Sequence, residues 1–246
     1  MDRTALITGA SGGVGRALAA RLRADGWRLA LVGRDAARLE PGAGDHAIVA
    51  DVSTQAGAGH AVAGAAEAFG TAPAALAHCV GSSLIAPIGR TGEPEWRAVM
   101  AANLDSAYFT LKAWLAARAS PGQGGSAVLF SSVAAGIGVA NHAAIAAAKA
   151  GVEALVRSLA ADGSAAGFRF NAIAPGLLAT PMTARMLASE HGARQIALQY
   201  PLGRFGQADD AAELAAFLLD ARAGWISGEV IRLDGGFSAV RPYLRA

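Results

Sequence analysis

The sequence predicts an α/β fold in which a doubly wound parallel sheet of seven strands carries helices on both faces. Short apolar runs alternate with longer alanine-rich stretches of helical spacing, which indicates a parallel sheet. The runs are apolar throughout, as expected for parallel strands covered on both faces. Right-handed crossovers then dictate the doubly wound arrangement. The expected strands are 4–8, 28–32, 46–50, 74–78, 126–130, 168–173 and 228–233.

The segments between these strands predict one domain with a single excursion. No linker is long enough to divide the chain, so residues 1–246 are expected to form a single domain. After the first strand, Val14, Leu18 and Leu22 recur at helical spacing. Residues 181–206 contain no expected strand. They are predicted to form one or two helices that cover a substrate pocket as a lid.

Composition and charge exclude several classes of protein. The chain has 246 residues, of which 53% are hydrophobic and 16% charged, so it is not disordered. The net charge is +2 and the arginines are scattered, which argues against a nucleic-acid surface. No segment is long and apolar enough to predict a membrane span, and "MDRTALITGA" does not resemble a signal peptide. A single cysteine, Cys79, excludes an internal disulfide and favours a cytoplasmic location. No spacing of metal ligands is present, so no metal is expected.

The stretch "TGASGGVG" (8–15) follows the first strand and opens a helix. Glycine allows backbone torsions closed to other residues and lets the chain approach a pyrophosphate. The N–H groups at the helix start would then face the anion. The motif predicts the nucleotide turn of a Rossmann fold, and an ordinary glycine-rich turn is the alternative. The candidate binding residues are Gly9, Ser11, Gly13, Val14 and Gly15.

The choice of cofactor is expected to depend on the end of the second strand, "LVGRD". A carboxylate there would hold a ribose diol, whereas an arginine would hold a 2′-phosphate. Gly33 occupies the end position and Arg34 follows, which favours NADP(H) over NAD(H). Asp35 argues the other way, and both charges could simply begin a solvated helix. Asp51 and Val52, after the third strand, are expected to contact the adenine.

Further motifs follow in order: "DVS" (51–53), "AANLDSAYF" (101–109), "SSVAAG" (131–136), "AAAKAGVEAL" (146–155), "NAIAPGLLATPM" (171–182), and a C-terminal third with "SGEVIRLDGG" (227–236). With the glycine turn, they make the sequence similar to the short-chain dehydrogenase/reductase family, of the single-domain kind that includes 3-oxoacyl-carrier-protein reductases. The resemblance covers nearly the whole chain. It implies a homotetramer, or at least a homo-oligomer, and a small carbonyl or alcohol substrate.

The resemblance also implies roles for individual residues. Ser132 would polarise the substrate carbonyl, Lys149 would hold the nicotinamide ribose, and Asn103 would hold a water that links the lysine to solvent. Gly81 would allow close approach to the cofactor. The segment against the nicotinamide would contribute Pro175, Gly176, Leu178 and Thr180.

The family's catalytic tyrosine is absent. It is expected thirteen residues after Ser132 and four before Lys149, and both counts lead to Ile145. The chain has three tyrosines, Tyr108, Tyr200 and Tyr243, and none lies in the lysine segment. Isoleucine exchanges no proton. Its presence would remove the roughly 10²–10⁴-fold that general acid–base catalysis typically contributes.

His142 is the candidate replacement for the tyrosine. It precedes Ile145 by three residues, so on a continuous helix the two would share a face, and imidazole titrates near neutrality. A histidine in the loop before a helix could instead cap the helix or face solvent. The chemical alternatives are a relay through Ser132 and water, or loss of carbonyl chemistry. His78 replaces an amide that the family usually has at the end of strand four, and a structural role is expected for it.

Three functions are therefore open. The first is an NAD(P)(H)-dependent oxidoreductase that interconverts a carbonyl and an alcohol with a non-standard proton donor. The second is a nucleotide-binding sensor or inactive subunit, and the weakest is a non-redox lyase or isomerase. In the lid, Met182, Met186, Leu187 and Ile196 favour a hydrophobic substrate. Arg185 and Arg194 could instead meet an acidic or phosphorylated carrier, or simply lie on the surface.

Overall fold

A computed structural model describes residues 3–120 and 122–240, and its centre is a seven-stranded parallel sheet of order β3-β2-β1-β4-β5-β6-β9. All seven expected strands are present, with ends shifted by two residues at most. Their bounds are β1 Thr4–Thr8, β2 Arg28–Gly33, β3 His46–Val49, β4 Ala75–His78, β5 Gly125–Phe130, β6 Phe168–Pro175 and β9 Val230–Leu233. Two short strands, β7 (Leu178–Ala179) and β8 (Gly206–Gln207), pair separately.

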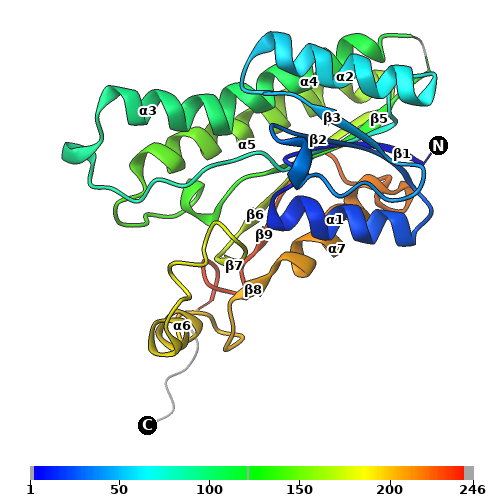
Figure 1. Cartoon of the computed structure of the whole chain (residues 1–246). Helices are drawn as coiled ribbons and strands as arrows, with labels where there is room; N and C mark the ends of the chain where they lie inside the picture. Colours follow the sequence, from blue (N-terminus) through cyan, green and yellow to red (C-terminus); the bar gives the residue numbers. More distant parts are fainter. Residues whose placement is uncertain (1–2, 121, 241–246) are drawn as a thin grey trace.

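Helices cover both faces of the sheet, so the doubly wound arrangement is confirmed (Figure 1). Helices α1 (Gly13–Ala24) and α7 (Ala208–Leu219) pack together on one face. The other face carries α2 (Gln55–Phe69), α4 (Ser106–Ala117) and α5 (Ala143–Gly163). Each face has its own apolar core. Leu18 and Leu22 of α1 lie in the first core, as their spacing predicts.

Not every strand is covered on both faces, although the apolar runs predicted this for all seven. Strands β1, β4 and β5 are buried along their whole length, whereas the edge strand β3 is mostly exposed. The strand order reverses between β1 and β4. The carboxyl ends of these two strands therefore flank the crevice where ligands bind in open α/β sheets.

The stretch 93–118 is helical but not one regular helix. Helix α3 (Glu93–Met100) continues into a π-helical turn over Ala101–Asp105, and α4 follows. A π-turn inserts one extra residue per hydrogen bond and is frequent at functional sites. Here it contains Asn103, so the turn determines where that side chain points.

The excursion at 181–206 contains one helix, α6 (Glu190–Ala197), which begins with a cap in which Ser189 Oγ accepts from the Gly192 N–H at 3.0 Å. In Figure 1 this segment projects beyond the carboxyl edge of the sheet. At its root, Thr183 Oγ1 accepts from the Thr180 N–H at 3.1 Å. Within residues 3–120 and 122–240, no helix is long and apolar enough to cross a membrane.

Candidate active site

The glycine turn between β1 and α1 has the geometry that a phosphate needs. Gly9 has φ +68°, and a Cβ there would lie 2.7 Å from the Cys79 carbonyl carbon at the end of β4. A Cβ at Gly15 would collide with the Gly9 carbonyl oxygen. Only glycine fits these two positions, so the turn closes tightly against the neighbouring strand.

Helix α1 begins at Gly13 without a capping side chain. Its N-cap residue Gly12 has no side chain to accept the first N–H groups, and its first turn contains no acidic residue. Unpaired N–H groups and the positive end of the helix dipole favour an anion. Gly13, Val14 and Gly15 line the same cavity as Ser132 and Lys149. These features fit the pyrophosphate of a dinucleotide.

The end of β2 carries two arginines, Arg34 and Arg38, and one carboxylate, Asp35, that caps a short helix. A Cβ at Gly33 would meet the Leu39 side chain at 3.0 Å, so this position is packed rather than open to a ribose. Asp35 caps the short helix 36–38 by accepting from the Ala37 N–H at 3.0 Å. Arg34 is exposed and does not line the cavity, whereas Arg38, which the sequence did not single out, does.

The other residues expected at the adenine end are also placed. Asp51 is exposed and accepts from the hydroxyl of Ser53 at 2.7 Å, which keeps the pKa of its carboxyl below the ordinary value. Val52 is buried in the core beneath. Ser11 Oγ would lie 3.5 Å from a Cβ at Gly33. None of the three lines the cavity.

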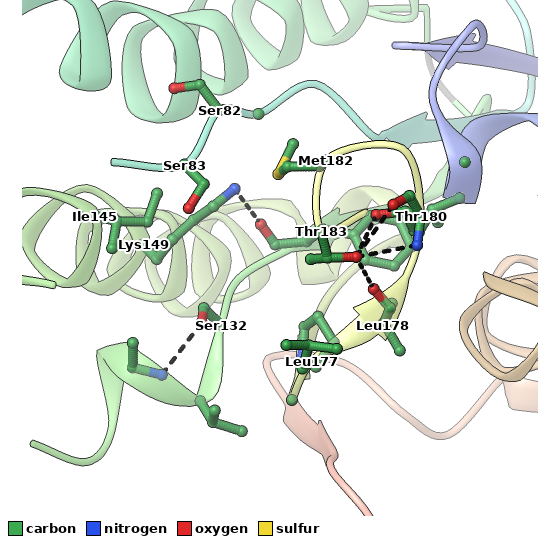
Figure 2. A pocket seen from close by; sticks show the side chains of 18 of the residues that line it. Ser82, Ser83, Ser132, Ile145, Lys149, Leu177, Leu178, Thr180, Met182 and Thr183 are labelled. Atoms are coloured by element: carbon green, nitrogen blue, oxygen red, sulfur yellow. Dashed lines mark hydrogen bonds between the residues drawn. The ribbon is translucent and has the colours of Figure 1, made fainter. Parts of the chain in front are cut away.

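One cavity of about 520 Å³ runs from the glycine turn to the lid. Such a volume suits a small-molecule site. Its cofactor end is formed by the glycine turn and by the segment after β6, and its other end by the loop after β4, the start of α5 and the lid (Figure 2). The expected residues that line it are Gly13, Val14, Gly15, Gly81, Asn103, Ser132, His142, Lys149, Pro175, Gly176, Leu178 and Thr180.

Lys149 is the buried cation of this cavity. It comes from α5, is 7% exposed, and its Nζ donates to the Phe130 carbonyl oxygen at 2.7 Å. Burial lowers the pKa of Lys149 to about 8, because the ammonium loses hydration. Figure 2 shows the side chain crossing behind Ser83 to the end of β5.

Asn103 is oriented by Ser82, and no sequence pattern predicts this contact. The amide oxygen Oδ1 accepts from the Ser82 N–H at 3.2 Å, and Nδ2 donates to Ser82 Oγ at 3.0 Å and to the Val99 carbonyl at 2.9 Å. A Cβ at Gly81 would lie 3.0 Å from Asn103 Oδ1 and 3.4 Å from Lys149 Nζ. Gly81 therefore leaves the space in which the asparagine and the lysine approach each other.

Ser132 follows β5 and faces the cavity. Its Oγ accepts from the Ala134 N–H at 3.2 Å, which fixes the oxygen at the start of the turn 133–135. The hydroxyl hydrogen remains free to donate to a ligand, since a hydroxyl has one donor and two acceptor sites. The adjacent Ser131 is buried and donates to Glu153 Oε1 at 2.7 Å, so it braces α5 instead.

Ile145 and His142 both line the cavity, but they do not share a helical face. Helix α5 begins at Ala143, and His142 precedes it with φ −110° and ψ 17°. The condition for a shared face, a continuous helix through His142, is therefore not met. Ile145 is 6% exposed and packs with Val99 and Ala148 in a small apolar cluster. The histidine reaches the cavity from the loop that leads into the helix.

The hydrogen bond of His142 defines its neutral tautomer. Nδ1 lies 2.7 Å from the Ala140 carbonyl oxygen. A carbonyl only accepts, so Nδ1 carries the hydrogen, and Nε2 is left with a lone pair in the neutral ring. The side chain does not cap α5. The ring is thus held by one nitrogen and has the other available.

His78 has the structural environment expected for it. Nδ1 pairs with Thr8 Oγ1 at 2.8 Å and Nε2 with Ser106 Oγ at 3.0 Å, so the ring joins β1, β4 and α4. Ser106 Oγ also donates to the Ala102 carbonyl in the π-turn at 2.8 Å. Burial lowers the pKa of His78 to about 3, which keeps the ring neutral. Cys79 next to it has its pKa raised to about 12 by burial and stays a thiol.

The fold and the site together define a nucleotide-binding α/β protein with the side chains of an oxidoreductase. The family model described as "Enoyl-(Acyl carrier protein) reductase" matches residues 9–238. The chain belongs to the short-chain dehydrogenase/reductase family.

Individual relatives agree with this assignment. The chain is 36% identical to "Inactive 2-(S)-hydroxypropyl-CoM dehydrogenase 2" of Xanthobacter autotrophicus, over 87% of this chain and 96% of the relative. It is 32% identical to the "(3R)-3-hydroxyacyl-CoA dehydrogenase" of Mus musculus, over 94% and 95%. A solved short-chain type dehydrogenase/reductase from Mycobacterium ulcerans superposes with a TM-score of 0.90 at 30% identity, covering 98% of this chain and 91% of that one.

Proposed function

We propose that the protein is an NADP(H)-dependent oxidoreductase that interconverts a ketone and a secondary alcohol, with His142 in the role of the missing tyrosine. The observation that carries the proposal is that His142, Ser132 and Lys149 line one cavity with the glycine turn. A nicotinamide cofactor, when bound, would supply or accept the hydride. The residues of the chain would bind the two partners and move the proton.

His142 is suited to both directions of the reaction. In the neutral ring, Nε2 accepts the hydroxyl proton of an alcohol while the Ala140 carbonyl holds Nδ1–H in place. In the reverse direction, the imidazolium gives the Nε2 proton to the oxygen formed from the carbonyl. Ser132 donates its free hydroxyl hydrogen to the same oxygen.

Lys149 and Asn103 serve the cofactor end of the reaction. The Lys149 ammonium, still charged at neutral pH with a pKa of about 8, would hold the nicotinamide ribose. Asn103 lies beside it across Gly81 and would position a water between the lysine and solvent. Pro175, Gly176, Leu178 and Thr180 would face the nicotinamide ring.

The cations at the end of β2 support NADP(H) over NAD(H). Arg38 lines the cavity, and Arg34 lies close enough to Asp51 to contribute to its lowered pKa. Asp35, the residue that argued for NAD(H), is engaged at the cap of the short helix 36–38. Guanidinium groups fit a 2′-phosphate.

The second candidate is a nucleotide-binding protein without redox turnover, such as a sensor or the inactive subunit of a mixed oligomer. Ile145 favours it because this side chain transfers no proton, and one relative carries "Inactive" in its name. The presence of Ser132, Lys149 and Asn103 favours the first candidate, an active oxidoreductase.

We also propose a cytoplasmic homo-oligomer. No described strand pairs with the outer edge of β9, and Phe217 of α7 is 38% exposed. Trp225, in the loop before β9, is fully exposed. Apolar side chains beside an open strand edge are typical of an interface. Light scattering of the purified protein would give the number of subunits.

Replacement of His142 tests the proposed proton donor. His142→Ala should lower kcat for ketone reduction by about 100-fold, within the range for a general acid. It should leave NADPH affinity unchanged, since the ring is away from the glycine turn. His191→Ala is the matched control, because His191 is exposed and lies outside the cavity lining. Undiminished kcat in His142→Ala would exclude this residue as the donor.

A further inference from the structure

The part of the cavity away from the glycine turn has an unusual charge distribution. Its walls come from the loop after β4, the segment 132–145, the lid and the start of the C-terminal loop. Among the residues described as lining it, the apolar ones are Ile85, Val133, Ala134, Val139, Ile145, Leu177, Pro181, Met182, Met186, Ile196 and Phe237. They form most of this part of the cavity wall.

Almost no charge faces a substrate there. No aspartate or glutamate is present among the lining residues that the structure describes. Arg38 lies at the cofactor end, and the Lys149 ammonium is directed to the Phe130 carbonyl. Within residues 3–120 and 122–240, His142 is therefore the one side chain lining this part of the cavity that can carry a positive charge.

The three lid arginines do not change this distribution. Arg204 is exposed, lies outside the cavity lining and pairs with Asp210 at 2.7 Å. Arg185 and Arg194 are exposed and lie outside the cavity lining. Arg194 forms an ion pair with Glu190 on the surface of α6 at 3.8 Å. They thus offer no cation inside the pocket to a carboxylate or a phosphorylated carrier.

The polar groups that remain are neutral. The Tyr200 hydroxyl oxygen accepts from the Leu177 N–H at 2.7 Å, and its hydrogen can still donate to a ligand without carrying a charge. Ser82 is bound to Asn103. The Ser83 side chain makes no hydrogen bond with any other residue in the described ranges, and Figure 2 shows it beside Ile145 and Lys149. These hydroxyls can bind a carbonyl or hydroxyl oxygen but cannot neutralise an anion.

We propose that this cavity selects a small, neutral, apolar ketone or secondary alcohol and discriminates against substrates that carry a carboxylate or phosphate. The inference rests on the proposed function, because it assigns the substrate of that site. An apolar substrate gains by leaving water, whereas an anion loses its hydration without a compensating partner. The cavity of about 520 Å³ also contains the nicotinamide end, so the substrate is small.

A pair of probes of similar size tests the selection. We would measure dissociation constants of para-isopropylacetophenone and para-acetylbenzoate by calorimetry, with the wild-type protein saturated with NADP⁺. Oxidised cofactor and ketone cannot react, so binding is measured apart from turnover. We expect the neutral ketone to bind at least tenfold more tightly. Equal or tighter binding of the carboxylate, or no binding of either ketone to the loaded protein, would overturn the proposal.

The same titrations separate this proposal from the proposed function. Binding of NADP⁺ is measured first, and its failure would overturn the function itself. Selective ketone binding without NADPH turnover would contradict only the redox function.

A charge introduced at the cavity mouth provides the complementary test. Met182 is 57% exposed and lines the cavity, so Met182→Arg should fold and should place a cation at the entrance. We expect para-acetylbenzoate to gain about tenfold in affinity. Leu198→Arg is the matched control, because Leu198 is 72% exposed and lies outside the cavity lining. An equal gain in both variants would show that only net charge matters.

Discussion

The two ends of the cavity differ in how they are built. At the cofactor end, backbone contacts fix each position: the Gly9 and Gly15 sites admit no side chain, and Gly13 begins an uncapped helix. At the substrate end, side chains from the loop after β4, from α5 and from the lid meet, and one of them is Ile145 in place of a tyrosine. Backbone geometry therefore constrains the nucleotide site, whereas a change of one side chain can alter the chemistry at the substrate end.

Restoring the tyrosine should have the largest effect. When Ile145→Tyr is made in the His142→Ala background, the hydroxyl would enter the cavity beside Ser132 and Lys149, so ketone reduction should rise by about 10²-fold or more over His142→Ala. Ile145→Phe in the same background adds the ring without the hydroxyl and controls for size. Steady-state rates of NADPH oxidation measure both. A rise in neither variant would mean that the substrate end has diverged beyond this residue.

The cofactor end should tolerate an added side chain far less well than the substrate end. In Gly15→Ala the new methyl collides with the Gly9 carbonyl, so the turn must shift, and NADPH affinity should fall by about 100-fold. Gly59→Ala in α2, where a Cβ meets nothing within 4 Å, is the control and should bind normally. Fluorescence titration measures the affinities and circular dichroism confirms folding. Normal binding by Gly15→Ala would refute the close-approach argument.

Lys149 links the two ends, and its burial lowers the free energy of unfolding by an amount that can be measured. Its pKa of about 8 lies below the ordinary 10.5, so between these values the unfolded chain binds more protons than the folded one. The unfolding free energy should therefore rise with pH across this window, by about 3 kcal/mol in total.

The variant Lys149→Met measures how much Lys149 contributes to the pH dependence of the unfolding free energy. It should be more stable than the wild type at neutral pH, should lose the rise between pH 8 and 10.5, and should bind the cofactor weakly. Urea titrations at several pH values measure it. A rise of equal size in Lys149→Met would assign the effect to other groups.

The smallest effect is expected from Ser82, which orients Asn103. Ser82→Ala removes the acceptor of the Asn103 Nδ2–H at 3.0 Å and should lower kcat a few-fold, with little change in NADPH affinity. Ser82→Thr keeps the hydroxyl and should restore the rate. If the rate stayed low in the threonine variant, the loss would come from packing and not from the hydrogen bond.

The fold and the cofactor end could be predicted from sequence because their features are local. The strand pattern predicts the sheet, and the glycine spacing predicts the turn. Asn103 was found through its motif, but its π-turn and its contact with Ser82 depend on two segments that meet only in the folded chain. The position of His142 before α5, and of Arg38 on the cavity, likewise depends on loop conformation that no periodicity encodes.

The most direct test of the central claim is whether the wild-type protein transfers hydride at all. Purified protein would be given NADPH and a panel of neutral ketones, and loss of NADPH absorbance would be matched to the alcohol formed. We predict turnover with one alcohol formed for each NADPH consumed, and its loss in His142→Ala. NADPH binding without turnover of any ketone would contradict the account and leave a nucleotide-binding protein that kept its lysine and lost its acid.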